Sequence, residues 1–510
     1  MAKKREERKD RKSTSGTGVC DLDGGFVTPE LSFQNLSFEA IRNVIINSRY
    51  IQILLSLTVI GAILRFVNLG FNSLWLDEAS TYQFAIKSIP DIWQATTGGE
   101  FNPPLFYWVE HIMLMFGNNE MILRFVPALL GVLTIPLFYL IGKEFVDRNV
   151  GIIAAAICTF SPFLIFYSQE ARAYSMGLFF VAFALVFFLK ALKTNNLTPW
   201  ILFGVLSALA FWTHFYTLVV TGALVLYALA VKVPELRKDI RAFVPFVASG
   251  VVFAVICLPL IIVTLQLFAK RTSSAPSFGI QGIGIIFETF RQLSGYSEMV
   301  MVLFLILFVV GIVQAFLLDR NKGLLLVALT FLPFAISWFL SYRIPMMPRY
   351  LIILAPVFFV GIALAYRPVY KLISNRGVVY GFIALAILLS VTTPFFTGYY
   401  TSYSKEDWKG FSGQVRQLAQ PGDLIVLAPG YLNQPFDYYY SNTTEGTFEY
   451  GAATAGQFAM IAASRTNNTV FFVVTGDLSS ADPSGETIAW LQEHTTGIEA
   501  TPNIYLFTYR

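Results

Sequence analysis

The stretch that decides the fold is YIQILLSLTVIGAILRFVNLGFNSLWLDEASTY, residues 50–82. Its first part is an apolar run of about 20 residues, which is the length that an α-helix needs to cross a bilayer. Two adjacent carboxylates, Asp77 and Glu78, follow this run between Trp75 and Tyr82. They are either ordinary polar residues at the water-facing end of a membrane helix or part of a functional site.

The composition of the chain is that of an integral membrane protein. Of its 510 residues, 55% are hydrophobic and 13% are charged, whereas ordinary soluble domains carry about 25% charged residues. The three cysteines have no metal-ligand or CxxC spacing, and three histidines are too few for a His-rich metal cage. The sequence contains no glycine-rich phosphate fingerprint, so a nucleotide is not an expected ligand. A nucleic-acid partner is not expected either.

Eleven apolar runs have about the length of a membrane span. They lie at residues 50–68, 121–142, 150–167, 172–192, 198–213, 215–231, 243–265, 299–318, 323–341, 350–366 and 378–397. The stretch 102–117, NPPLFYWVEHIMLMFG, is shorter and contains Glu110 and His111, so it fits an interfacial or re-entrant helix better. With this stretch outside the membrane and the N-terminus in the cytoplasm, every inner loop carries at least two lysines or arginines, as the positive-inside rule requires.

This topology predicts three parts in a multi-pass protein of the plasma membrane. Residues 1–48 form a basic, disordered cytoplasmic tail, and residues 49–398 form a transmembrane domain with a large first external loop at 69–120. Residues 399–510 form a small extracytoplasmic α/β domain, because strand-like runs alternate there with amphipathic helical segments. The strands are expected at 423–429, 469–476 and 503–509, and the helices at 405–419 and 485–494.

The unusual polar residues of this topology lie on the outer face. Glu170 and Arg172 belong to SQEARAY, at a turn between two spans, and Arg349 opens a later span from the outside. Each has an ordinary explanation: an ion pair within a turn, or an interfacial arginine that extends its charge toward water. Because guanidinium groups suit phosphate oxygens, their presence on the face that carries Asp77 and Glu78 favours a site for a lipid-borne phosphate.

Five motifs, in this order, resemble the membrane-embedded glycosyltransferases of the GT-C type. They are LWLDEASTY (74–82), NPPLFYW (102–108), FGNNEMILRFVPALLGVLTIPLFYLIGKEF (116–145), SPFLIFYSQEARAYSM (161–176) and MPRYLIILAP (347–356). The sequence is most similar to the family 39 group, which includes protein O-mannosyltransferases, and to the related aminoarabinose transferases. The resemblance covers roughly residues 50–400 and implies an α-helical polytopic fold.

The resemblance implies transfer of a sugar from a polyprenyl or dolichyl phosphate to a hydroxyl of a lipid, glycan or protein acceptor. The transfer would take place outside the cytoplasm, with inversion. Asp77 would be the general base, and Glu78 would shape the same pocket. Arg172 and Arg349 would hold the departing lipid phosphate. The further candidates for substrate binding are Tyr174, Glu170 and Asn102.

At two points the sequence does not decide what the family resemblance implies. Relatives often carry His or Lys before the two prolines, where this chain has Asn102. Some relatives bind a divalent metal through a loop glutamate and a histidine, and Glu100 and His214 are the nearest candidates here. A lone histidine between apolar spans is, however, more often a hydrogen-bonded structural residue.

A multi-pass transporter of a lipid or polar solute is the alternative class. Its typical marks are internal repeats and helices broken near mid-membrane around polar groups. The two halves of this sequence share no evident repeat, and the polar residues gather at one surface. A receptor or assembly subunit that acts through residues 399–510 is a third, weaker alternative.

Overall fold

The structure is a computed structural model, and it describes residues 21–24, 37–100, 102–236, 239–465, 468–476, 478 and 482–509. Most of the predicted tail, 1–20 and 25–36, lies outside the described residues. The chain divides into two compact units. The first unit comprises residues 1–65, 128–168 and 173–396, and the second unit comprises residues 66–127, 169–172 and 397–510.

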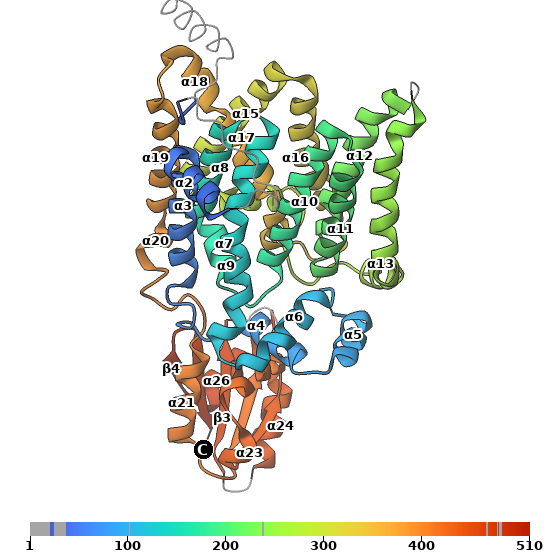
Figure 1. Cartoon of the computed structure of the whole chain (residues 1–510). Helices are drawn as coiled ribbons and strands as arrows, with labels where there is room; N and C mark the ends of the chain where they lie inside the picture. The colour runs from blue at the N-terminus through green and yellow to red at the C-terminus, as the bar shows by residue number, and fades with distance from the viewer. Residues whose placement is uncertain are drawn as a thin grey trace, which may run out of the picture. The chain divides into compact units, whose positions relative to one another are not determined.

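The first unit is a bundle of helices, most of which run roughly along one axis (Figure 1). The helices that lie wholly or mainly in it are α2 (Phe38–Asn47), α3 (Arg49–Phe66), α7 (Glu120–Phe145), α8 (Arg148–Phe160), α9 (Pro162–Ser168), α10 (Tyr174–Thr194), α11 (Leu197–Thr213), α12 (Thr217–Leu236), η2 (Ile240–Phe243), α13 (Val244–Arg271), α14 (Gly284–Leu293), α15 (Glu298–Leu318), α16 (Arg320–Leu340), η3 (Pro348–Leu354), α17 (Ala355–Leu364), α18 (Tyr366–Ile373), α19 (Gly377–Val391) and α20 (Pro394–Gly398).

Seven described helices are long and apolar enough to cross a membrane, or eight if α8 and α9, which meet at a bend of 59°, form one broken span. Three shorter apolar helices are Leu197–Thr213, Thr217–Val233 and Gly377–Val391. Each of the eleven predicted runs falls on one of these helices. The chain is therefore a multi-pass membrane protein, and eleven stays a prediction for its number of spans.

Close helix packing in the bundle depends on small residues. A Cβ atom added at Gly311 in α15 would lie 2.8 Å from the carbonyl carbon of Gly361 in α17 and would also meet its carbonyl oxygen. Only glycine allows two helix backbones to approach this closely, as is common between membrane helices.

The second unit combines short helices with a β-sheet. Its helices are α4 (Leu76–Ala85), α5 (Ile89–Gly98), α6 (Leu105–Met113), η1 (Leu114–Phe116), α21 (Trp408–Leu418), η4 (Gly430–Leu432), α22 (Asn433–Tyr439), α23 (Asn442–Glu445), α24 (Ala455–Ser464) and α26 (Glu486–His494). Its strands are β1 (Leu424–Ala428), β2 (Phe448–Gly451), β3 (Val470–Thr475), β4 (Thr496–Thr501) and β5 (Ile504–Tyr509). The apolar stretch 102–117 forms α6 and η1, and α6 is too short to cross a membrane.

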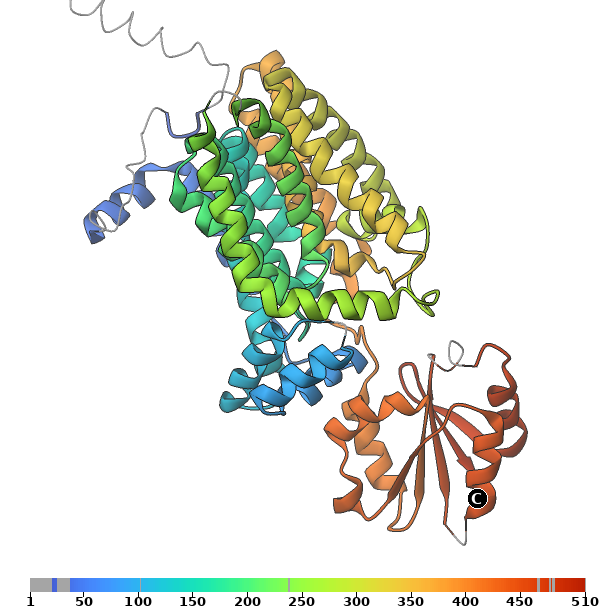
Figure 2. The same ribbon diagram turned by 90° about the vertical axis from the view of Figure 1, so that its right-hand side faces the viewer.

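The sheet has the strand order β2-β1-β3-β5-β4 and helices on both faces (Figure 2). Strands β2, β1 and β3 are parallel, β5 is antiparallel to β3, and β4 is antiparallel to β5. Alternate residues of β1 and β3 pack against α21 and α22 on one face and against α24 and α26 on the other. The predicted α/β domain is confirmed, with β1, β3, β5, α21 and α26 where the sequence predicts strands and helices.

Candidate active site

Asp77 and Glu78 lie in the first turn of α4. Negative charge is favourable at this end of a helix because the first N–H groups are unpaired. Successive residues of an α-helix are rotated by about 100°, so the two neighbours face different surroundings. The side chain of Glu78 is fully buried, whereas the side chain of Asp77 is 25% exposed. Of the pair, only Asp77 is accessible to a substrate.

Arg124 of α7 holds the buried carboxylate of Glu78. Its Nε donates to Oε1 and its Nη2 donates to Oε2, both at 2.7 Å. The guanidinium also donates to the backbone carbonyl oxygens of Leu69, Asn72 and Ser73, at 2.8 to 3.0 Å. Arg124 thereby fixes both the carboxylate and the backbone that leads into α4.

Glu78 has two more partners in the second unit. Its carboxylate accepts hydrogen bonds from the backbone N–H of Ala171 at 2.8 Å and from Lys405 Nζ at 3.0 Å. Burial raises the pKa of Glu78, but the charges of Arg124 and Lys405 and the hydrogen bonds from Arg124 and Ala171 hold it well below its usual range. Glu78 therefore stays ionised at neutral pH, and its environment suits a structural role in the site better than proton exchange.

Arg172 lies beside Asp77. Its Nε is 3.9 Å from Asp77 Oδ2, and its Nη1 donates to the Asp77 backbone carbonyl at 3.1 Å and to Thr81 Oγ1 at 3.3 Å. Glu170, two residues earlier, pairs with Lys405 at 3.2 Å. The turn 169–172 thus brings Glu170 and Arg172 to α4.

Tyr107 of α6 connects the remaining candidates of the second unit. Its hydroxyl donates to Glu100 Oε1 at 2.9 Å, and it is buried with Asn102 close by. Burial raises the pKa of Tyr107 well above its usual value, the charge of Glu100 raises it further, and the charge of Arg172 opposes this rise. Tyr107 is therefore a neutral donor that links the loop residues Glu100 and Asn102 to the surroundings of Arg172.

Glu110, also in α6, has an unusual environment for a carboxyl group. It is fully buried, and neither carboxyl oxygen has a hydrogen-bond partner among the residues that the structure describes. Burial raises the pKa of Glu110 well above its usual value. Burial therefore favours the neutral form of this carboxyl group.

The other three predicted site residues belong to the first unit. Tyr174, at the start of α10, packs against His214 with ring centroids 5.7 Å apart and against Tyr350 at 6.2 Å. Arg349, in η3, lies over the ring of Tyr350 at 5.6 Å, and the backbone N–H of Tyr216 donates to His214 Nδ1 at 3.3 Å. Tyr174, His214 and Arg349 therefore surround one aromatic cluster.

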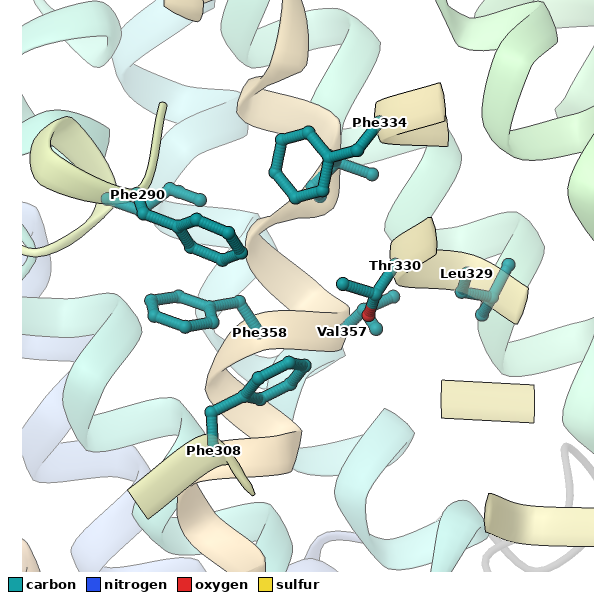
Figure 3. Close-up of a pocket in the computed structure, with 9 residues that line it drawn as sticks. Phe290, Phe308, Leu329, Thr330, Phe334, Val357 and Phe358 are labelled. Carbon is teal, nitrogen blue, oxygen red and sulfur yellow. The ribbon is translucent and has the colours of Figure 1, made fainter. Parts of the chain in front are cut away.

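A hollow in the first unit lies among α14, α15, α16, η3 and α17 (Figure 3), and Thr330 is the one polar residue in its lining. Its lining residues are Phe290, Leu293, Phe308, Leu329, Thr330, Phe334, Leu354, Val357 and Phe358. The Thr330 hydroxyl donates to its own helix, at the carbonyl of Leu326. The hollow is apolar packing space, and the candidate site is the cluster around Asp77.

Residues 102–263 match the family described as dolichyl-phosphate-mannose-protein mannosyltransferase. ArnT from Cupriavidus metallidurans in the apo state superposes with a TM-score of 0.58 at 12% identity, covering 92% of this chain and 98% of that one. The oligosaccharyltransferase of Archaeoglobus fulgidus superposes with a TM-score of 0.52 at 15% identity, covering 87% of this chain and 71% of that one. Both are GT-C glycosyltransferases. The chain has the GT-C fold.

An uncharacterised protein of Aquifex aeolicus (strain VF5) is 32% identical over 131 residues, which are 24% of this chain. The match spans only 26% of that relative's length. The family match begins before α6 and ends within α13, so the predicted resemblance to family 39 is confirmed for residues 102–263, and the GT-C fold extends over most of the chain.

The family resemblance implies a divalent metal in some relatives, with Glu100 and His214 as the candidate ligands in this chain. Among the described residues, no group of three or more His, Cys, Asp or Glu could hold a metal ion. Glu100 accepts a hydrogen bond from Tyr107 in the second unit, and His214 belongs to the aromatic cluster of the first unit.

Sequence reasoning missed Arg124 and Lys405 as members of this candidate site. Arg124 lies in EMILRF, within one of the motifs that carry the family resemblance, whereas Lys405 lies in YSKEDW, beyond the residues that the resemblance covers. A scan for buried charges inside apolar motifs would have found Arg124. Lys405 gives no such signal, because it lies in a polar stretch.

Proposed function

We propose that this protein transfers a sugar from a polyprenyl or dolichyl phosphate to an acceptor hydroxyl on the extracytoplasmic side of the plasma membrane. The observation that carries the proposal is that the two adjacent carboxylates of α4 have different environments. Asp77 is accessible beside Arg172, while Glu78 is buried and ionised beside Arg124. One accessible carboxylate beside a guanidinium suits transfer from a phosphate leaving group.

A lipid-linked donor is supported by the proteins to which the chain is similar. The matching family is described by dolichyl-phosphate mannose, and ArnT has been crystallised with undecaprenyl phosphate at a TM-score of 0.55 to this chain. AglB of Archaeoglobus fulgidus is known in complex with a dolichol phosphate. The sequence itself contains no nucleotide fingerprint. A lipid-linked donor in the membrane therefore agrees with the similar proteins and with the sequence.

In the proposed reaction, Asp77 accepts the proton of the acceptor hydroxyl as the hydroxyl oxygen attacks the anomeric carbon of the sugar. The bond from that carbon to the phosphate oxygen breaks, and its electrons leave on the phosphate. Attack from the face opposite the phosphate inverts the anomeric centre. Arg172 and Arg349 stabilise the growing negative charge of the lipid phosphate.

The sidedness of this site follows from the distribution of cations. The inner loops would hold Lys143, Arg148, Lys190, Lys193, Lys232, Arg237, Lys238, Arg241, Arg320, Lys322, Arg367, Lys371 and Arg376. The N-terminus is then cytoplasmic, and the loop 69–120 and the domain 399–510 are extracytoplasmic.

Replacement of Asp77 by asparagine tests the proposal. Asp77→Asn keeps the shape of the side chain and removes its basicity, so sugar transfer from a polyprenyl-phosphate donor should fall by about 10²–10⁴-fold. Donor binding should be largely retained. The matched control is Asp91→Asn, an exposed carboxylate in the first turn of α5. Near-normal turnover of the Asp77→Asn enzyme would end the assignment of this base.

Replacement of the arginines by lysine tests the phosphate contact. Arg172→Lys and Arg349→Lys keep the charge but lose the planar fork, so we expect turnover to fall while insertion and purification stay normal. Arg343→Lys, an exposed arginine before η3, is the control. Unchanged kinetics in both variants would contradict the phosphate contact and leave these arginines with interfacial roles only.

A further inference from the structure

We propose that Lys405 is a positioning residue of the active site, supplied by the segment that opens the C-terminal domain. Lys405 Nζ lies 3.0 Å from Glu78 Oε2 and 3.2 Å from Glu170 Oε1, and its side chain is 8% exposed. It thereby joins α4 to the turn 169–172. The proposal rests on the proposed function, because it concerns how Asp77 and Arg172 are aligned.

The segment around Lys405 is firmly attached to the chain that precedes α4. Asn72 Oδ1 accepts from the backbone N–H of Ser404 at 3.0 Å. Ser73 Oγ donates to Asp407 Oδ1 at 2.9 Å and accepts from the backbone N–H of Lys409 at 3.1 Å. Lys405 is therefore not a mobile surface lysine.

Further contacts on both sides of Lys405 extend this attachment. The rings of Phe71 and Tyr403 are stacked with centroids 4.8 Å apart, and Asn68 Nδ2 donates to the carbonyl of Tyr400 at 2.7 Å. The ammonium group of Lys405 lies 5.7 Å from the ring centre of Trp75. Residues 400–409 thus run along residues 68–75, directly before the catalytic carboxylate.

The two carboxylates that Lys405 bridges are neighbours of the two groups proposed to act on the substrate. Glu78 follows Asp77, and Glu170 precedes Arg172 by two residues. The Ala171 N–H adds a direct hydrogen bond from the turn to Glu78. Lys405 and this N–H together hold Arg172 Nε at 3.9 Å from Asp77 Oδ2.

The charges of this cluster balance. Glu78 and Glu170 contribute two negative charges, and Arg124 and Lys405 contribute two positive charges; Glu78, Glu170 and Arg124 are buried, and the side chain of Lys405 is 8% exposed. Arg124 already pairs with Glu78 through two hydrogen bonds. Lys405 is therefore the only one of these two cations that also reaches Glu170.

The test uses the full-length enzyme and two variants. Lys405→Met leaves Glu170 without this cation and should destabilise the fold, so Lys405→Met/Glu170→Gln, which removes both charges, serves as the variant that folds. In the double variant we expect kcat to fall on the order of 10²-fold, the size of the effect of about 1 Å of misalignment. The donor KM should change less, since alignment of the base matters most in the transition state.

Hydrogen exchange gives a readout that does not depend on activity. The amide of Ala171 should exchange faster in both variants. In the control Lys409→Met, an exposed lysine loses its ion pair to Glu120, and both that amide and kcat should stay unchanged. Wild-type exchange at Ala171, or full turnover in the double variant, would overturn the positioning role and reduce Lys405 to a counter-ion of Glu170. If the wild-type enzyme fails to transfer sugar from a polyprenyl phosphate, the proposed function fails, and exchange at Ala171 still decides whether Lys405 holds the turn.

Discussion

At the scale of the residue, the site depends on two adjacent carboxylates with opposite environments. Glu78 is buried with a bidentate guanidinium, and Asp77 is partly exposed. A buried ion pair that loses one partner leaves an uncompensated charge, which costs about 3–5 kcal/mol. Glu78→Gln should therefore lose activity through misfolding of the site, whereas Asp77→Asn should lose it through chemistry.

The stability that Glu78 contributes to the wild-type protein should depend on pH in a defined direction. The folded state lowers the pKa of Glu78 to about 2, below the unfolded value of about 4.3. The ion pair therefore contributes its full stability above the unfolded pKa and loses it as pH falls through the folded pKa. The difference in melting temperature between wild type and Glu78→Gln should narrow as pH falls from about 4.3 to 2.

The control for this titration is Glu39→Gln, which changes an exposed carboxylate in the first turn of α2. Its melting temperature should stay parallel to that of the wild type over the same window, because surface changes away from special features have small effects. A constant gap between Glu78→Gln and the wild type down to the lowest pH would contradict the ion-pair argument.

At the scale of the element, the break between α8 and α9 leads directly to the turn that carries Glu170 and Arg172. In a continuous helix the carbonyl of Cys158 would accept the N–H of residue 162, but Pro162 has none. Arg65 of α3 takes the place of this donor, with Nη2 donating to the Cys158 carbonyl at 3.0 Å. The 59° bend is thus held by a buried arginine from another helix.

A glycine beside this arginine makes the arrangement testable. A Cβ at Gly131 in α7 would lie 2.8 Å from Ser168 Cβ and 3.2 Å from Arg65 Nε. Gly131→Ala should therefore destabilise the protein by about 1–3 kcal/mol, as overpacking usually does. Gly222→Ala in α12 is the control, since nothing lies within 4 Å of its added Cβ. The packing argument would be contradicted if thermal unfolding in detergent gave Gly131→Ala a melting temperature equal to or higher than that of Gly222→Ala.

Sequence patterns predicted the elements that carry a strong local signal. DLIVLAP and TVFFVVTG contain the uninterrupted apolar runs LIVLA and VFFVV, which form most of the central strands β1 and β3. The two missed strands lie at the edges of the sheet, where half-exposed residues give no such run. Phe448–Gly451 is only four residues long, and Thr496–Thr501 reads TGIEAT.

At the scale of the whole molecule, the site could be predicted only in part because its groups are far apart in the sequence. Asp77, Glu78, Glu170 and Arg172 follow from motifs. The partners of Glu78 lie 46 residues away, at Arg124, and 327 residues away, at Lys405. No periodicity or local spacing connects such positions. The second unit is accordingly built from three segments of the chain.

The orientation of the whole molecule can be tested with two engineered cysteines. Thr443 in α23 and Asn375 before α19 are both exposed, so burial does not distinguish them. Cys158 and Cys257 are buried and need no replacement, while Cys20 is changed to serine. The cation distribution predicts that Thr443 lies outside and Asn375 in the cytoplasm. In intact cells, a membrane-impermeant thiol reagent should label Thr443→Cys and leave Asn375→Cys unlabelled until the membrane is permeabilised. If only Asn375→Cys is labelled in intact cells, the predicted topology is contradicted. The proposed site would then lie on the cytoplasmic face, which excludes an extracytoplasmic transfer.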